Sequence, residues 1–188
     1  MTTEPAGKGD AILFMKVGTH AAEPLADIIQ RKRREISDAG YAMWGYGGNT
    51  CHPSTTVQPF AASHAGAGRV IRLCMHPMES KHFAEQVRAD EFSTDGFSWY
   101  PVPRGINVLG SRYALCIGSL YHADWDLALD QTQVVIGKSK GRSGEEYIKG
   151  RVDKACLEVV GSSSSGGRSV HIGLVAEIIQ PYAVFLRN

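Results

Sequence analysis

The residues best suited to chemistry lie in a ten-residue stretch, WGYGGNTCHP, at positions 44–53. Its glycines let the backbone approach a ligand closely or adopt positive φ angles. A phosphate held by the glycine backbone, with a base stacked on an aromatic ring, would use every group that the stretch offers. A tight turn from a strand to a helix with packed aromatics is the alternative. The candidate ligand-binding residues here are Trp44, Gly45, Tyr46, Gly47, Gly48, Asn49 and Thr50.

Cys51 and His52 indicate a second chemistry, nucleophilic catalysis by a thiol. Neighbours on an extended backbone point to opposite sides, so Cys51 would need a more distant base. The candidate bases are His20, His64 and His76, which follow or interrupt expected strands. A helix that begins just after this loop would favour a thiolate or another anion there. A small Cys/His-dependent hydrolase or transferase is therefore an alternative function.

The spacing of the histidines does not define a metal site. His52, His64, His76 and His82 are 12, 12 and 6 residues apart, which matches no common ligand pattern. The segment HADWD at 122–126 places two carboxylates on one face if it is extended, and we interpret it as a solvated turn between strands. We expect neither a metal nor a cofactor.

Two basic segments carry positive charge that a ligand could use. Residues 31–34 place four cations within one helical turn, and residues 138–154 hold six Lys and Arg against three acidic residues. The second segment is rich in glycine and serine, which suits a loop that follows a phosphate backbone or clamps a phosphorylated ligand. A solvated face explains the same pattern. The candidate ligand-binding residues in these segments are Lys32, Lys138, Lys140, Arg142 and Tyr147.

The overall composition excludes broad electrostatic binding. The 188 residues include 20 Lys and Arg against 19 Asp and Glu, for a formal net charge of +1. The net charge is small because opposite charges cancel. Residues 91–137 carry a net charge of −3, which offsets part of the positive charge of the two basic segments. A neutral chain is not a histone-like polyanion binder, but it can hold a local anion site.

Apolar periodicity predicts the elements that position these residues. Strands are expected at 11–17, 41–46 and 69–75, and a helix at 24–39 joins the first two. We expect a helix at 53–64 that Pro59 kinks, and a short helix from Ser80 to about residue 90. Residues 11–90 would then form a β-α-β unit with short helices.

From residue 91 the pattern changes to strands alone. Asp95 and Gly96, between Phe92 and Trp99, predict a hairpin. Further strands are expected at 106–109, 113–120, 133–136, 154–160, 170–179 and 183–186, with a flexible hairpin loop at 161–167. We therefore predict an α+β fold whose half at 91–188 is a twisted, mostly antiparallel sheet that could curl into a half-open barrel. The chain is expected to be a single globular domain of residues 1–188, with a flexible N-terminus at 1–10.

The sequence holds no signal-peptide pattern and no apolar stretch long enough to cross a membrane. Its four cysteines lack CxxC spacing, which suits a cytoplasmic protein with free thiols. The favoured function is a recognition domain for a nucleotide, a short nucleic acid or another phosphorylated ligand. The Cys/His enzyme stays open, as does a non-catalytic scaffold or assembly subunit that forms a homo-oligomer, suggested by the aromatic and proline residues at 99–103.

Overall fold

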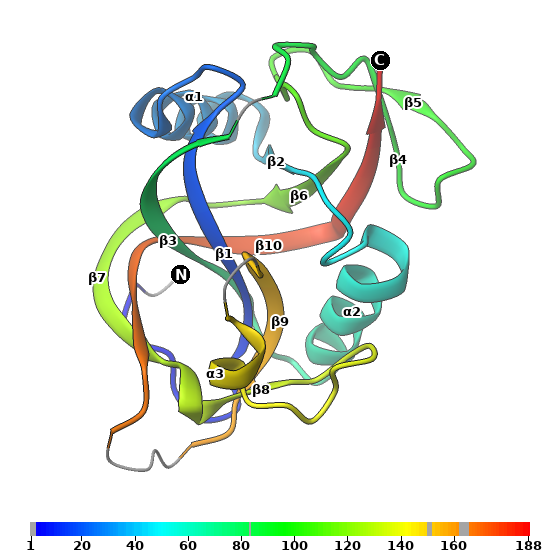
Figure 1. Ribbon diagram of the computed structural model, residues 1–188. Helices are drawn as coiled ribbons and strands as arrows, with labels where there is room; N and C mark the ends of the chain where they lie inside the picture. Colours follow the sequence, from blue (N-terminus) through cyan, green and yellow to red (C-terminus); the bar gives the residue numbers. More distant parts are fainter. Residues whose placement is uncertain (1–2, 83, 150–151, 162–165) are drawn as a thin grey trace.

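The computed structural model describes residues 3–82, 84–149, 152–161 and 166–188 (Figure 1). Its elements form one mixed sheet of ten strands with helices packed against it. The strands are β1 (Ala11–His20), β2 (Ala42–Tyr46), β3 (Ile71–His82), β4 (Glu91–Ser93), β5 (Tyr100–Pro101), β6 (Tyr113–Ile117), β7 (Tyr121–Ala128), β8 (Thr132–Val134), β9 (Lys154–Val159) and β10 (Ser169–Arg187). The helical segments are α1 (Leu25–Ala39), η1 (Pro53–Val57), α2 (Gln58–Gly66), η2 (Leu129–Gln131) and α3 (Gly144–Tyr147).

The main path of the sheet runs β2-β6-β10-β3-β1-β9-β8. β1 and β3 are parallel, and the other described strand pairs are antiparallel. β10 is the longest strand and pairs with β3, β4, β6 and β7, so it connects the two halves of the sequence (Figure 1). The path ends at β2 and β8 and does not close into a barrel, and the expected half-open curl of the sheet stays a prediction.

The beginning of the chain follows the predicted order of strand, helix and strand. α1 starts after Pro24 and ends at Gly40, whose φ of 85° is the left-handed conformation that stops a helix. However, β1 and β2 are not neighbours in the sheet, because β3, β10 and β6 lie between them. The sequence from residue 91 supplies seven of the strands in the same sheet, while the single-domain organisation stays a prediction.

Strand alternation builds a core on each face of the sheet. Leu13 and Met15 of β1 point into one cluster, where they meet residues of α1 and α2. Ile12 and Phe14 point into a second cluster on the opposite face. A continuous apolar run in the sequence therefore becomes a strand buried on both sides, as a central strand must be.

The kinked helix expected at 53–64 is confirmed in part. η1 is a π-helical turn, and it continues directly into α2. Pro59 lies at the junction in the first turn of α2, where it has no N–H to donate to the carbonyl groups of the preceding π-helical turn. The helix therefore changes from π to α geometry next to Pro59, where an interruption was expected.

Three expectations for the middle of the chain are wrong. The helix expected from Ser80 is absent: residues 80–82 extend β3, whose pairing with β1 continues to its end, and residues 84–90 are not helical. Residues 106–109 form no strand beyond an isolated bridge between Arg88 and Leu109. The segment 122–126 is not a turn but part of β7, in which Trp125 and Leu127 point to the core and the aspartates alternate with them toward solvent.

Some expectations fall outside the described residues. These are residues 1–2 of the N-terminus expected to be flexible, Phe83 of the expected helix, residues 150–151 of the second basic segment, and residues 162–165 of the expected hairpin loop. In the described ranges, no helix combines the length and the apolarity that crossing a membrane requires.

Candidate functional site

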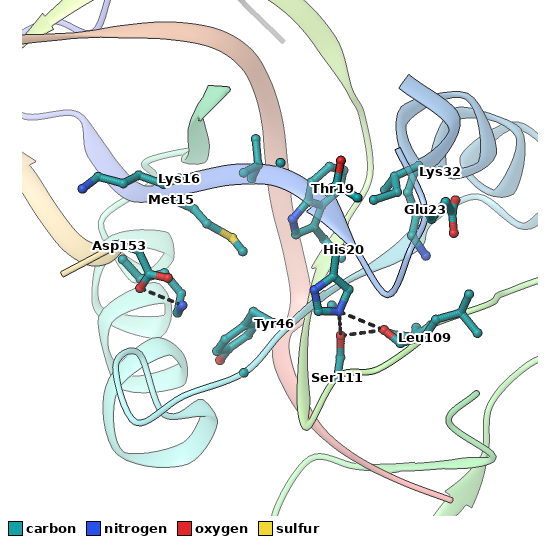
Figure 2. A pocket seen from close by; sticks show the side chains of 18 of the residues that line it. Met15, Lys16, Thr19, His20, Glu23, Lys32, Tyr46, Leu109, Ser111 and Asp153 are labelled. Carbon is teal, nitrogen blue, oxygen red and sulfur yellow. Dashed lines mark hydrogen bonds and ion pairs between the residues drawn. The ribbon is translucent and has the colours of Figure 1, made fainter. Parts of the chain in front are cut away.

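A pocket of about 390 Å³ lies where the end of β1, helix α1, and β2 with its following loop come together (Figure 2). The segment 107–111 and residues 153–154 complete its wall. Seven of the residues predicted to bind a ligand line this pocket: Lys32, Trp44, Gly45, Tyr46, Gly47, Gly48 and Thr50. The structure thus brings the first basic segment and the glycine loop together, and their role in binding stays a prediction.

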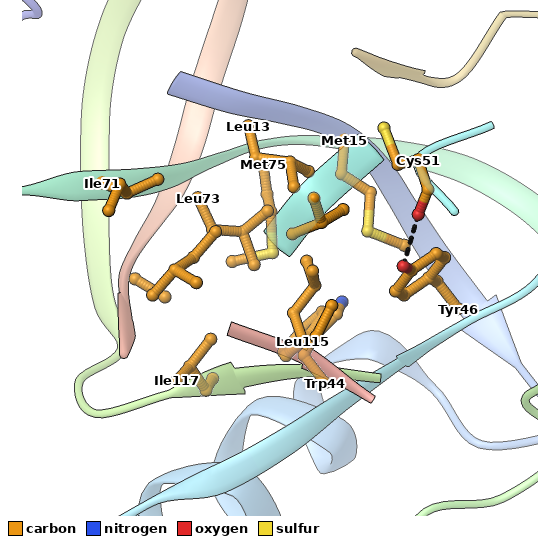
Figure 3. Packing of buried hydrophobic residues seen from close by; sticks show 14 of the residues in the cluster. Leu13, Met15, Trp44, Tyr46, Cys51, Ile71, Leu73, Met75, Leu115 and Ile117 are labelled. Atoms are coloured by element: carbon orange, nitrogen blue, oxygen red, sulfur yellow. Dashed lines mark hydrogen bonds between the residues drawn. The ribbon is translucent and has the colours of Figure 1, made fainter. Parts of the chain in front are cut away.

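The two aromatic residues of the glycine loop form the inner wall of the pocket. Trp44 and Tyr46 are both buried and belong to the core cluster that also contains Met15 (Figure 3). The hydroxyl of Tyr46 donates a hydrogen bond to the carbonyl oxygen of Cys51, and burial raises the pKa of Tyr46. These rings pack mainly against protein rather than standing free as stacking platforms.

One end of the pocket holds a network of balanced charges. The Lys32 ammonium donates to Glu35 Oε2 at 2.9 Å and to the carbonyl oxygen of Asn107 at 2.7 Å. Arg31 forms a two-pronged ion pair with Glu23, at 3.0 and 2.9 Å, and a further ion pair with Glu35. Burial lowers the pKa of Lys32 to about 8, against the opposing effect of Glu35. Two cations here face two carboxylates.

The other end of the pocket holds an ion pair whose two partners are unequally buried. Lys154 has a nearly buried side chain, and its Nζ lies 2.9 Å from Oδ1 of the half-exposed Asp153 and 5.9 Å from the centre of the Tyr46 ring. The backbone N–H of Lys16 donates to the carbonyl oxygen of Asp153 at 2.9 Å, whereas the Lys16 side chain points away from Met15 and the pocket (Figure 2). Lys16 and Asp153 lie on the opposite side of the pocket from Lys32 and Glu23 (Figure 2).

His20 lies in the pocket wall beside Ser111, but the pair is not arranged for nucleophilic catalysis (Figure 2). Nε2 of His20 is 3.1 Å from the carbonyl oxygens of both Leu109 and Gly110. Carbonyl oxygens only accept, so Nε2 carries a hydrogen. The Ser111 hydroxyl donates to Leu109, and its Oγ lies 3.4 Å from His20 Nε2. In this arrangement, Nε2 cannot take the proton of Ser111.

Asn107 supplies an unused hydrogen-bonding atom at the balanced end. The residue lines the pocket, and its Oδ1 is buried with no hydrogen-bond partner among the described atoms. A buried acceptor without a partner has a cost of about 1–3 kcal/mol, which a ligand donor could offset.

The other candidates at the glycine loop do not line the pocket. Cys51 is buried in the core, with its Sγ 3.9 Å from that of Cys156. Nδ1 of His52 accepts from the backbone N–H of Thr55 at 3.4 Å, and its ring packs edge-on against aromatic neighbours. Asn49 is likewise outside the pocket lining. The contacts of Cys51 and His52 are thus those of a core thiol and a helix cap.

Of the described residues in the second basic segment, Asp153 and Lys154 at its end line this pocket. Lys138, Lys140, Arg142 and Tyr147 are not part of the lining. Lys140 lines a separate hollow beside α2 together with His64, and Tyr147 packs against the second core cluster. Within the described residues, no group of three or more His, Cys, Asp or Glu side chains is arranged to hold a metal ion.

Sequence reasoning missed much of the pocket wall. The missed residues that carry polar groups include Lys16, Thr19, Glu23, Asn107, Ser111 and Asp153, whereas His20 was expected only as a base for Cys51. Thr19, His20 and Glu23 directly follow the first expected strand, a position where sites are common, and this was the available signal. The sequence of the segment 107–111 contains no such signal. This segment reaches the pocket through contacts between residues about ninety positions apart.

No known protein family, no curated protein and no solved structure matches this chain. The function of the protein is therefore inferred from the geometry and charge of the pocket.

Proposed function

We propose that the protein is a recognition domain for a small phosphorylated ligand, which binds in the pocket between β1, α1 and β2. The observation that carries the proposal is the unequal burial of the charged partners at the two ends of the pocket. Lys32 and Glu35 are both buried and Arg31 is paired with Glu23, whereas at the other end the buried Lys154 is paired with the half-exposed Asp153. An anionic group of a ligand would give the Lys154 ammonium a second partner.

The burial of Lys154 strengthens this preference. Its side chain is only 6% exposed, so solvent screens its charge less than it would screen a surface lysine. Hydrogen bonds from an ammonium to a phosphate are about twice as strong as neutral ones. The phosphoryl group of the ligand is therefore assigned to the end that holds Lys154.

The glycines of the loop leave the backbone accessible beside this end. A Cβ added to Gly47 or Gly48 would meet no atom within 4 Å, so both positions face open space. Gly48 has a φ of 82°, a conformation that other residues rarely adopt. A backbone of this kind can approach an anion closely, and both glycines line the pocket.

The size and polarity of the pocket limit the ligand further. A volume of about 390 Å³ is near the lower limit of small-molecule sites, so a nucleic acid would fit at most through a single nucleotide. We therefore favour a small sugar phosphate or mononucleotide over an oligonucleotide.

Thermal-shift and calorimetric titrations with inorganic phosphate, ribose 5-phosphate, AMP, adenosine and a short oligothymidylate test this proposal. We expect the sugar phosphate or AMP to raise the Tm and adenosine to leave it unchanged. A ligand at about 100 times its Kd adds about 2.7 kcal/mol to the free energy of unfolding. Raising salt from about 50 to about 500 mM should weaken the effect, because the interaction is electrostatic.

Variants locate the binding. Lys154→Met keeps the apolar stem and removes the charge, and we expect it to raise Kd by about tenfold or more, which is about 1.4 kcal/mol. Lys138→Gln and Lys140→Gln are matched controls outside the pocket and should leave Kd unchanged. The proposal fails if no phosphorylated compound shifts the Tm, or if only the control variants weaken binding.

A further inference from the structure

Cys51 and Cys156 are 105 positions apart in the sequence, but their Sγ atoms lie 3.9 Å apart in the core. Both thiols are buried, and both belong to the core cluster beneath the pocket. Cys74 and Cys116 each lie in a different cluster, and burial raises the pKa of each to about 12. The structure therefore separates one close pair of thiols from two isolated ones.

The backbone at Cys51 is unusual for a residue with a side chain. Its φ is 60°, in the left-handed region that favours glycine. The hydrogen bond from the Tyr46 hydroxyl to the Cys51 carbonyl holds this conformation (Figure 3). The loop has glycines at Gly47 and Gly48, but it places a cysteine at this left-handed position, with its sulfur against that of Cys156.

We propose that Cys51 and Cys156 are a reversible thiol–disulfide site that links the glycine loop to β9. A disulfide has an S–S distance of about 2.05 Å, so the two sulfurs must approach by about 2 Å from where they lie as thiols. A side-chain rotation with a small adjustment of the loop supplies a movement of that size. The inference depends on the sulfur geometry and not on the ligand proposed for the pocket.

A peroxide is the oxidant class for which the reaction balances simply. The sulfur of Cys51 attacks one peroxide oxygen, the O–O bond breaks, and the leaving hydroxide takes up the thiol proton to give water and a sulfenic acid. The sulfur of Cys156 then attacks the sulfenic sulfur, and the hydroxyl leaves as a second water. Two thiols lose two electrons and two protons in total, and hydrogen peroxide becomes two waters.

Cys51 is assigned as the residue that is oxidised first. It belongs to a loop, whereas Cys156 lies in the middle of β9 between two paired strands. The hydrogen bond with Cys51 and burial together raise the pKa of Cys156, which keeps it a thiol until its partner is oxidised. Cys156 is then the resolving thiol, within contact distance of the sulfenic acid.

The disulfide would connect two walls of the pocket. Gly47, Gly48 and Thr50 lie just before Cys51, and Lys154 lies two residues before Cys156, and all four line the pocket. Oxidation would therefore fix the glycine loop relative to Lys154. It would also close a long loop of chain, which restricts the unfolded state and raises the Tm by on the order of 5–10 °C.

Peptide mapping of the full-length protein tests the proposal without any variant. The reduced protein is treated with hydrogen peroxide, remaining thiols are blocked with N-ethylmaleimide in denaturant, and trypsin is added without reductant. Cleavage after Lys and Arg leaves each cysteine on its own peptide, with Cys51 on residues 35–69 and Cys156 on residues 155–168. We expect a linked pair of these two peptides that dithiothreitol separates, and a higher Tm before reduction.

Single substitutions provide the controls. Cys74→Ser and Cys116→Ser should leave the linked pair intact, and Cys51→Ser and Cys156→Ser should each remove both the pair and the rise in Tm. The proposal is overturned if wild-type Cys51 and Cys156 are recovered blocked or over-oxidised but not linked, or if links to Cys74 or Cys116 form equally. Because the readout is a peptide mass, failure of this proposal is distinct from failure to bind a phosphorylated ligand.

Discussion

Nζ of Lys32 lies 2.9 Å from Oε2 of Glu35, three residues further along α1, and both side chains are almost fully buried. The pair is completed by Arg31, which bonds Glu35 from the same helix, and by the backbone of Asn107. The buried face of α1 therefore carries charged groups among its apolar residues. These groups bond the backbone of Asn107 and hold the segment 107–111 against the pocket.

This arrangement predicts a pH dependence of stability. The pKa of Lys32 is about 8 in the folded protein and about 10.5 in the unfolded chain. Between these values the unfolded chain binds more protons, so the contribution of Lys32 to the free energy of unfolding rises with pH. The slope is at most about 1.4 kcal/mol per pH unit. Urea unfolding of the wild type and Lys32→Met at pH about 7.5 and 9.5 measures the change.

We expect Lys32→Met to be destabilising at the lower pH, by less than the 3–5 kcal/mol typical of a broken buried pair, because Arg31 still bonds Glu35. The free energy of unfolding of the wild type should then rise relative to that of the variant as pH increases from 8 to 10.5. An equal difference at both pH values would show that Lys32 does not titrate there.

The contact between Gly45 and Ser111 predicts a steric requirement in β2. A Cβ on Gly45 would lie 2.2 Å from Ser111 Oγ and 2.9 Å from Val108 Cγ1. Gly45→Ala should therefore lower the free energy of unfolding by about 1–3 kcal/mol. The matched control is Gly47→Ala in the same loop, which meets no atom within 4 Å. Chemical denaturation of both variants provides the comparison.

A second substitution separates steric clash from other effects of Gly45→Ala. Removing the Ser111 side chain in Gly45→Ala/Ser111→Gly should recover part of the lost stability, because the nearest clashing atom is gone. Equal stability of Gly45→Ala and Gly47→Ala would contradict the packing described for the pocket wall.

The hairpin between β4 and β5 depends on the carboxylate of Asp95. Its Oδ1 accepts from the backbone N–H groups of Ser98 and Phe97, at 2.8 and 2.7 Å, and from the Ser93 hydroxyl at 2.8 Å. These hydrogen bonds lower the pKa of Asp95 to about 2. Asp95→Ala should lower the Tm at neutral pH, whereas Asp124→Ala, on an exposed carboxylate of β7, should not.

The carboxylate of Asp95 also predicts how stability changes in acid. The folded pKa is below the usual value of 3.8, so the stability that Asp95 contributes is present above that value and is lost as pH falls toward 2. The Tm difference between the wild type and Asp95→Ala should therefore shrink in this window. A carboxyl chemical shift of Asp95 that titrates near 3.8 in an NMR experiment would refute the bonding scheme.

Arg72 predicts how the segment before β1 is held. Its guanidinium donates to Asp10 Oδ2 at 2.6 Å and to the carbonyl oxygen of Glu4 at 2.8 Å. Arg72→Met should lower the free energy of unfolding by about 1–3 kcal/mol and speed amide exchange in residues 7–10. Arg69→Met, which removes a more exposed guanidinium, is the control. Unchanged exchange in Arg72→Met would mean that other contacts hold this segment.

Local periodicity made the first part of the fold predictable. β1, β2 and the first part of β3 are short apolar runs, and α1 has an apolar helical period between Pro24 and Gly40. β7 was missed because only one of its edges pairs within the described sheet, with β10, so alternate positions carry His122, Asp124 and Asp126. In the sequence, these polar residues resemble a solvated turn, because few apolar residues lie between them.

The site could be predicted only where neighbours in sequence are neighbours in space. The glycine loop and Lys32 were found from residue types alone, and both line the pocket. Asn107, Ser111 and Asp153 reach it through strand pairing and loop contacts that no local pattern encodes. The same reason explains Cys51: its residue type suggested catalysis, but its partner in space is a thiol on β9.

The position of β10 has a consequence for how the protein folds. β10 follows the other strands of the sheet in chain order, and β3, β4, β6 and β7 all pair with it. β1 likewise pairs with β9 across about 145 positions. Until β9 and β10 have been synthesised, these strands therefore lack part of their pairing and expose sheet edges. Folding of this sheet should be slow, because it depends on contacts between segments that are far apart in the sequence.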